Sequence, residues 1–411
     1  SRDAVNFLKL RASWGRNGNI NVLTGYPYAD VINANNDWYQ YSATSSKQSY
    51  GSVTNGLPNP DLEWETSEQT DLGLDARFLN NRLSFGFDYF YKKTKGLLVN
   101  VTPVIETGVG SSTINAGDVK NSGFEFELGA SIFNTRNFSW DLDFTYSFNR
   151  NKVLSLPEEY AYDEVDEFGN ATGKKAYRIG GYKATETGYR WGGTAVGEPL
   201  GRIYGYKIDH IIQTLAEADA ALYDSESKGF RVSDGQRVLG RKDAGDYEWT
   251  NRRGSAKDEN GNEIINSEDM FYLGSVVPHS IGGINNTFTY KGLSLSIYMD
   301  YALGHSIVNG QKTQLLKNTM GDCNSMLGSL VYDCWSYPGD PNAKYARYTP
   351  NDSDWGNRNW RANSDFMVEK ADYLCIRDVT LSYDLPEKWL KPVHVKKLTV
   401  GVTGNTLYYF T

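Results

Sequence analysis

The chain has 411 residues, of which 14% are aromatic, and its formal net charge is −8. The acidic balance argues against nucleic acid as a partner, and three cysteines exclude a disulfide-dense scaffold. No run approaches the roughly 18 apolar residues of a transmembrane helix. The sequence carries no motif for a catalytic nucleophile, a phosphate loop or a zinc protease, so it does not indicate an enzyme.

Alternation of apolar and polar residues is the main local signal, because successive side chains of a β-strand point to opposite faces. The clearest stripes are Leu83–Tyr91, Phe138–Phe148 and Leu293–Leu303. In chain order, the predicted strands cover residues 5–16, 63–79, 82–98, 117–133, 138–150, 280–290, 292–303, 371–385 and 396–408. In the strand over residues 371–385, Arg377 falls at a position that the alternation would place among the apolar side chains. This mismatch predicts a β-bulge beside it.

The predicted strands run for about 10–14 residues, whereas strands of soluble proteins average about 5–6 and membrane strands need about 9–11. Their connections alternate in length. Short turns are predicted at residues 79–82, 134–137, 290–292 and 387–396, and long polar stretches at residues 17–62, 99–116, 151–279 and 304–370. Short periplasmic turns and long extracellular loops are typical of outer-membrane barrels. The sequence therefore predicts an all-β fold, a transmembrane antiparallel β-barrel.

The number of strands bears on what the chain represents. The ninth predicted strand runs toward the outer side of the membrane, and single-chain bacterial barrels have an even number of strands. We therefore expect at least one more strand beyond Thr411 and others before Ser1, so that residues 1–411 form a segment of a larger barrel. The alternative is a secreted, soluble all-β protein that binds or hydrolyses carbohydrate, because its strands would also alternate. A requirement for detergent separates the two.

The strand regions carry the motifs of a known family. They are KLRASWGRNGN (9–19), NPDLEWETSEQTDLGLDARFLNNRLSFGFDYFYKKTKGLL (59–98), NAGDVKNSGFEFELG (115–129), GEPLGRIYGYK (197–207), YKGLSLSIYMDYALG (290–304), ADYLCIRDVTLSYDLP (371–386) and LTVGVTGNTL (398–407). In this order they make the chain similar to the C-terminal barrel portion of SusC/RagA-type TonB-dependent outer-membrane transporters. Their joint occurrence is specific, whereas any one motif alone would be weak.

The resemblance implies a barrel of roughly 22 strands in the outer membrane of a Gram-negative bacterium, blocked from inside by an N-terminal plug. The plug, through which a TonB complex would act, and the last strand have no counterpart in these 411 residues. A SusD-like surface lipoprotein would cap the barrel, and a dimer of importer–lipoprotein pairs is the implied assembly. The implied function is TonB-dependent import of oligosaccharides, or of peptides.

An acidic loop is a candidate cation site. Asp258, Asn260 and Asn262 place side-chain oxygens at i, i+2 and i+4, as in a calcium loop, and Gly261 permits a turn. The sixth and twelfth positions lack the Gly and Glu of an EF-hand. The corresponding family loop reads D-x-N-G-D-G, and this chain departs from it. A polar hairpin turn explains the same residues more simply, and Ca²⁺ bound in the 258–269 loop is the alternative.

The long loops carry most of the tryptophans. Flat aromatic rings stack on sugar rings and also anchor protein interfaces. Packing inside the loops is the simpler explanation for many of them. The candidates for contact with cargo or lipoprotein are Trp38, Tyr39, Trp191, Trp335, Tyr337, Trp355 and Trp360.

Two further patterns leave alternatives open. Cys323 and Cys334 lie in one loop predicted to be extracellular, where disulfides are stable. A disulfide between them and two separate thiols fit the sequence equally well. Paired carboxylates such as Glu125 and Glu127 alternate with the aromatic stripe, and we interpret them as part of a hydrated lumen wall rather than as a glycosidase pair.

Overall fold

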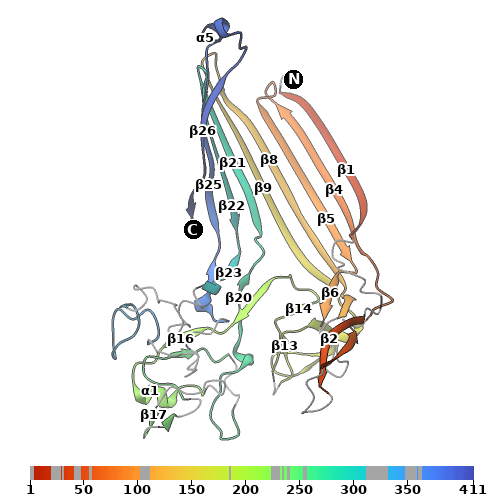
Figure 1. The fold of residues 1–411 in the computed structure, drawn as a ribbon, viewed down its shortest axis with the longest axis vertical. Helices are drawn as coiled ribbons and strands as arrows, with labels where there is room; N and C mark the ends of the chain where they lie inside the picture. The colour runs from red at the N-terminus through yellow and green to blue at the C-terminus, as the bar shows by residue number, and fades with distance from the viewer. Residues whose placement is uncertain are drawn as a thin grey trace.

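The fold is a curved β-wall with smaller units at one end (Figure 1). The computed structural model describes residues 4–19, 29, 32–40, 48–54, 58–101, 112–184, 187–223, 232–233, 236–237, 241–252, 257–311, 332–347, 359 and 363–411. The wall is one antiparallel sheet of β1 (Val5–Asn19), β4 (Glu65–Phe78), β5 (Leu83–Lys95), β8 (Asp118–Asn134), β9 (Phe138–Ser155), β21 (Ser280–Tyr290), β22 (Leu293–Leu303), β25 (Tyr373–Asp384) and β26 (Thr399–Phe410), in that order. All nine predicted strands are confirmed.

Short turns join the strands at one end of the wall, which we call the turn end. The fourth of these turns contains α5 (Glu387–Leu390) and a 3-10 helix, Lys391–Val393. Between β21 and β22, Lys291 and Gly292 have φ angles of 46° and 88°. Two positive φ angles give a two-residue hairpin the twist that its strands need. The opposite end, the loop end, carries the long connections (Figure 1).

The register places the apolar stripes on one face of the wall. Leu74 lies opposite Phe87, which lies opposite Phe126 on the next strand. Phe144 lies opposite Ile284 in the same way. Aromatic rings connect neighbouring strands there, as in the pair Phe126 and Phe144, whose centroids are 6.1 Å apart. We call this side the apolar face, and the side with Asp, Glu, Ser, Thr and Asn residues the polar face.

The predicted bulge beside Arg377 is confirmed. In β25 the pairing skips this residue against both β22 and β26. Its side chain therefore reaches the polar face, where Nε and Nη2 donate to the two carboxylate oxygens of Asp300 at 2.7 and 2.9 Å. The bulge keeps a cation off the apolar face and restores the alternation of the strand.

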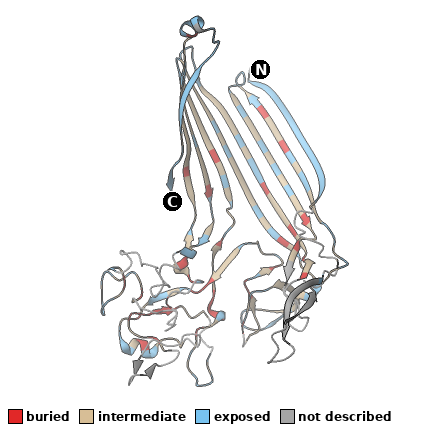
Figure 2. Ribbon diagram, viewed as in Figure 1, coloured by how far each residue is buried: buried red, intermediate tan, exposed pale blue. Residues whose placement is uncertain are grey.

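The outermost strands are exposed along most of their length (Figure 2). Within the described part of the chain, β1 and β26 each have a neighbour in the sheet on one side only. Each therefore presents a row of backbone N–H and C=O groups, which hydrocarbon cannot satisfy. Apolar side chains at these edges are exposed as well, and Leu10 is 81% exposed. Both edges are suited to pairing with further strands.

Smaller elements fill the loop end. One group consists of the hairpins β2 (Ile32–Gln40) with β3 (Gln48–Thr54) and β6 (Leu98–Val101) with β7 (Ser112–Asn115), a 3-10 helix at Glu158–Tyr160, and β10 (Ala161–Val165), β11 (Ala171–Ile179), β12 (Tyr182–Lys183), β13 (Arg190–Trp191) and β14 (Thr194–Ala195). The other comprises β15 (Arg202–Gly205), β16 (Ile208–Ile211), α1 (Leu215–Ala220), β17 (Val232–Ser233), β18 (Gln236–Arg237), β19 (Tyr247–Trp249), β20 (Phe271–Ser275), β23 (Ser306–Val308), β24 (Val368–Lys370) and the 3-10 helices Ser267–Asp269 and Asp365–Met367.

Part of the second group has a hydrophobic core of its own, and we call the described residues within 202–275 and 332–367 the cap. Its buried core consists of Tyr206, Tyr247, Trp249, Ile265, Met270, Ala346 and Met367. The sequence predicted only long polar connections here and did not reveal this core. None of the helices in the described ranges is long and apolar enough to cross a membrane.

Candidate functional site

The polar face of the wall is acidic at its centre. Strands β8, β9, β21 and β22 place Glu125, Glu127, Asp141, Asp143 and Asp300 on this face. All residues of these four strands are described, and none of those on the polar face is Lys or Arg. The centre of the wall therefore attracts cations and hydrogen-bond donors and repels anions.

Two arginines of the polar face lie nearer its edges, and carboxylates hold both of them. Arg11 on β1 lies 2.8 Å from Asp75 and 2.8 Å from Asp88, on the next two strands. Arg377 on β25 is paired with Asp300. Because these arginines are held by acidic partners, they do little to offset the negative field at the centre of the wall.

A cavity of about 450 Å³ lies on the wall in the half nearer the loop end. Cavities of roughly 300–1,000 Å³ hold small-molecule ligands. Asp300 in its lining is held in place, because the Tyr373 hydroxyl donates to its Oδ2 at 3.1 Å and Arg377 binds both oxygens. The polar side chains of the lining are Glu125, Glu127, Thr145, Ser147, Tyr298, Asp300, Tyr301 and Tyr373.

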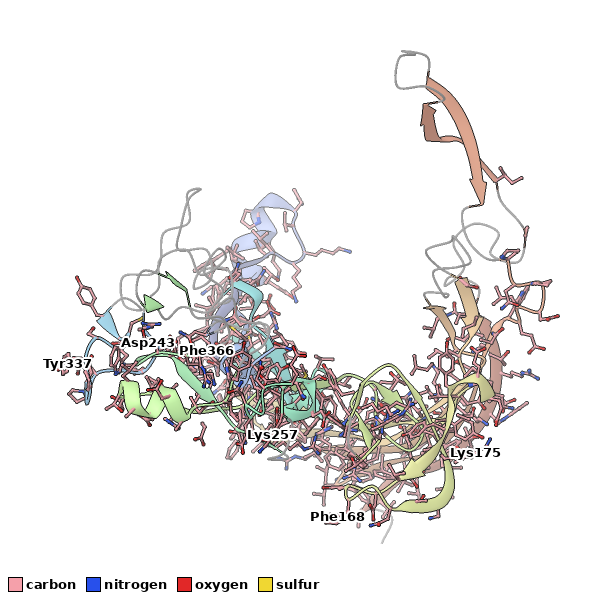
Figure 3. All side chains as sticks on the ribbon, turned by 90° about the horizontal axis from the view of Figure 1, so that it is seen from below. Phe168, Lys175, Asp243, Lys257, Tyr337 and Phe366 are labelled. Carbon is pink, nitrogen blue, oxygen red and sulfur yellow. The ribbon has the colours of Figure 1, made fainter. Side chains whose placement is uncertain are left out.

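Ion pairs join the two connections that form the cap. Asp246 is 1% exposed in its side chain and accepts hydrogen bonds from Arg347 Nε at 2.8 Å and Asn359 Nδ2 at 3.0 Å. Arg347 also pairs with Asp243 at 3.1 Å. Figure 3, seen from the loop end, labels Asp243 and Phe366 in the same part of the view, away from Phe168. These contacts span about a hundred residues of chain, so the cap holds two long connections together.

Trp191, a candidate contact residue, is part of the loop packing in this structure. It lies on β13 and is 4% exposed. Its ring centroid is 6.0 Å from those of Tyr182 and Tyr189, and the Arg252 guanidinium lies over it at 5.1 Å. A ring buried in this way stabilises the group around β12 and β13 and leaves little surface for a partner.

The other candidate aromatic residues are spread over the loop end. Trp335 is half-buried in the cap and donates from Nε1 to Gln213 Oε1 at 3.1 Å. Tyr337 is 53% exposed and lies at the margin of the cap in Figure 3. Trp38 and Tyr39 belong to β2, where their backbone alone is described, and Trp355 and Trp360 lie outside the described residues. Contact of these residues with cargo or lipoprotein stays a prediction.

The acidic loop forms a tight hydrogen-bonded turn. Asp258 Oδ1 accepts from the backbone N–H groups of Asn260 and Asn262 at 2.9 and 2.8 Å, and its Oδ2 accepts from Asn262 Nδ2 at 2.8 Å. The hydrogen bond from the Asn262 side chain is the main reason why the pKa of Asp258 lies below its ordinary value. Gly261 takes the left-handed conformation that the turn requires, with φ 82°.

The chain builds this turn a second time between β10 and β11. There Asp166 accepts from Phe168 N, Asn170 N and Asn170 Nδ2 at 2.9, 2.8 and 3.0 Å. Both turns have the sequence Asp-Glu-x-Gly-Asn. The repetition indicates a recurring turn in which the Asp carboxylate accepts hydrogen bonds from groups of the turn itself. Across the described residues, no three His, Cys, Asp or Glu side chains gather in a group that could hold a metal ion, and Ca²⁺ binding at the 258–269 loop stays a prediction.

Replacing Asp258 with Ala is expected to raise amide hydrogen exchange at Asn260 and Asn262 several-fold, whereas Glu259→Ala should leave it unchanged. Because the folded-state pKa of Asp258 is lowered below 3.8, the stability that its carboxylate contributes is fully present above that value and is lost as pH falls through the folded pKa. Exchange measured between pH 7 and about pH 3 tests this. Calorimetric titration with Ca²⁺ tests the cation site, since equal traces for wild type and Asp258→Ala would exclude it.

The predicted disulfide involves a residue that lies outside the described ranges. Cys334 is buried in the cap at 3% exposure, next to Trp335. Cys323 is not among the described residues. A disulfide between the two therefore stays a prediction, as does the alternative of two thiols.

Comparison with known proteins assigns the chain to a family. A family model described as TonB dependent receptor-like, beta-barrel, matches residues 3–210. A TonB-dependent receptor of Formosa agariphila is 30% identical over 405 residues, which cover 97% of this chain and 35% of the relative. The TonB-dependent receptor SusC of Bacteroides thetaiotaomicron is 31% identical over 180 residues, or 42% of this chain and 18% of SusC.

Solved structures support the same fold. The structure of the RagAB peptide transporter superposes with a TM-score of 0.67 at 20% identity, covering all of this chain and 38% of that one. The chain thus spans about a third of the length of the relatives that it matches along its whole length. Its nine-stranded wall is a segment of a transmembrane antiparallel β-barrel, as the sequence predicted. The chain belongs to the TonB-dependent receptor β-barrel family, and its similarity to the SusC/RagA-type members is confirmed.

Proposed function

We propose that this chain forms part of the barrel of a TonB-dependent importer in the outer membrane of a Gram-negative bacterium. The observation that carries the proposal is the wall itself, with one apolar and one polar face across nine strands. In this arrangement the apolar face contacts lipid and the polar face lines a hydrated lumen. The protein then acts as a transporter and not as an enzyme.

The open edges of the wall indicate how the barrel closes. Exposed β-edges are not tolerated in hydrocarbon, because every N–H and C=O group must find a partner. We propose that β1 and β26 pair with strands of the same receptor that lie outside these 411 residues. A plug inside that barrel would contact the polar face and receive the pull of the TonB complex.

The cargo and the partner belong to the same proposal. We propose import of oligosaccharides, with peptides as the second candidate, because RagAB is a peptide transporter of the same fold. The loop end, with its cap and exposed aromatics such as Tyr337, would face a SusD-like lipoprotein. A dimer of importer–lipoprotein pairs is the assembly that we expect.

Uptake in the source bacterium tests the proposal. We expect deletion of the gene to abolish uptake of a fluorescently labelled oligosaccharide or oligopeptide, and a plasmid copy to restore it. A protonophore should block uptake in the wild type, because the TonB complex depends on the proton gradient. Affinity purification in mild detergent should recover a lipoprotein with the receptor. Unchanged uptake of every labelled compound after deletion would contradict the importer proposal.

A further inference from the structure

A tyrosine covers a glycine on the polar face of the wall. Tyr298 lies on β22 and is 38% exposed, and Gly283 lies on the neighbouring strand β21. A Cβ atom added at Gly283 would lie 3.0 Å from Tyr298 Cε2 and 3.1 Å from its Oη. Because Gly283 has no side chain, the ring can lie against the backbone of β21. One side of the ring rests on the sheet, and its exposed remainder faces the lumen.

The wall offers a comparison residue on the other face. Tyr89 lies on β5 opposite Leu72 and Phe124, on the apolar face, and does not line the cavity. It is 44% exposed, close to the 38% of Tyr298. A change at Tyr298 can therefore be compared with the same change at Tyr89.

Fixed hydrogen-bonding groups surround Tyr298 in the cavity of about 450 Å³. Ser147 Oγ donates to Glu125 Oε1 at 3.3 Å, and Asp300 is held by Arg377 and Tyr373. Alternate residues of a strand are about 7 Å apart on one face, so Glu125 and Glu127 present separate acceptors along the wall. Acceptors spaced in this way suit several hydroxyl donors of one ligand better than a single cationic group.

We propose that this cavity is a subsite for a neutral sugar ring. Tyr298 stacks on the ring, and Glu125 and Glu127 accept hydrogen bonds from its hydroxyl groups. The carboxylates would repel an anionic ligand, and an apolar ligand would desolvate them without providing donors. The inference rests on the proposed import function and states which class of cargo binds at this cavity. The cavity is close to the loop end, from which cargo would enter.

Calorimetry on the full receptor in detergent tests the subsite. The probes are maltohexaose, cellohexaose, xylohexaose and mannohexaose, with trilysine as the cationic comparison. We expect at least one hexasaccharide to bind, and Tyr298→Ala to weaken that binding by about tenfold or more. Tyr298→Phe keeps the ring and should stay within about threefold of wild type, and Glu127→Gln should weaken binding several-fold. Tyr89→Ala, the control on the apolar face, should leave the affinity unchanged.

Three results would overturn the subsite. They are equal losses in Tyr298→Ala and Tyr89→Ala, unchanged binding in Tyr298→Ala, and binding of trilysine without binding of any hexasaccharide. Absence of all binding would likewise exclude a neutral-sugar site. These measurements use purified receptor, whereas failure of the import proposal would show as unchanged uptake after gene deletion. The two failures are therefore distinguishable.

Discussion

Replacing Asp246 with Ala is expected to destabilise the cap by about 3 kcal/mol. Removing one partner of a buried ion pair costs roughly 3–5 kcal/mol, because the other charge is left in the protein without compensation. The lower figure applies here because Arg347 still has an ion-pair partner in the variant, namely Asp243 at 3.1 Å. The substitution also removes the acceptor for Asn359 Nδ2. Local opening of the cap should become about a hundredfold more frequent.

Hydrogen exchange on the receptor in detergent measures this opening. The backbone N–H groups of Ile212 and Arg347 are suitable reporters, because they donate within the cap to Asp246 O at 2.9 Å and Gly245 O at 2.7 Å. Asp243→Ala is the matched control. Its carboxylate is 27% exposed, and its loss should cost about 1 kcal/mol or less. Equal exchange in the two variants would show that the buried pair does not hold the cap together.

Replacing Phe144 with Arg is expected to destabilise the barrel by about 2–4 kcal/mol, the cost of a cation on the lipid face near the bilayer midplane. Phe144 lies midway along the spanning part of β9, opposite Leu128 and Ile284, with the Phe126 ring 6.1 Å away. Thr145→Arg places the same charge one residue further on, where the side chain points to the polar face. We expect that variant to cost less than about 1 kcal/mol, since a hydrated lumen tolerates charge.

Guanidinium unfolding of the receptor in lipid vesicles provides the comparison. The midpoint for Phe144→Arg should fall well below that of wild type, and the midpoint for Thr145→Arg should stay close to it. If the two variants lose stability equally, the apolar face is not the one that contacts lipid. If only Thr145→Arg loses stability, the two faces have been assigned the wrong way round.

The wall could be predicted from the sequence because its signal is local. In Phe138–Phe148, every second residue lies on the apolar face, so the stripe can be seen without knowledge of the neighbouring strands. The same reasoning located the bulge, because regular alternation would have placed the Arg377 side chain on the apolar face. The short turns followed from the ends of the stripes, and the observed turns lie at the predicted positions.

The cap could not be predicted in the same way. Its stability depends on contacts such as Asp246 with Arg347, which are 101 residues apart and form only after both connections have folded. Residues of this kind look like ordinary loop residues in a sequence. Trp191 illustrates the same limit, because its burial against Tyr182 depends on pairing between β12 and β13. The alternation of short and long connections indicated where the loops are but not what they build.

The proposed subsite left a weak signal in the sequence. Adjacent glycines at 282 and 283 interrupt a strand whose neighbours carry large side chains, and glycine in a strand often marks a close approach of other groups. The residue that makes the approach, Tyr298, is set by the register between β21 and β22. That register depends on the turn at Lys291 and Gly292, so the pair could be recognised only in the folded structure.

Fractionation of the source cells tests the central claim most directly. An antibody against the chain should detect the protein in the outer-membrane fraction, and only detergent should release it. The released receptor should be larger than these 411 residues and should carry a lipoprotein. If the protein is instead recovered in the soluble fraction without detergent, the apolar face does not contact lipid, and the account of a membrane-spanning wall is wrong.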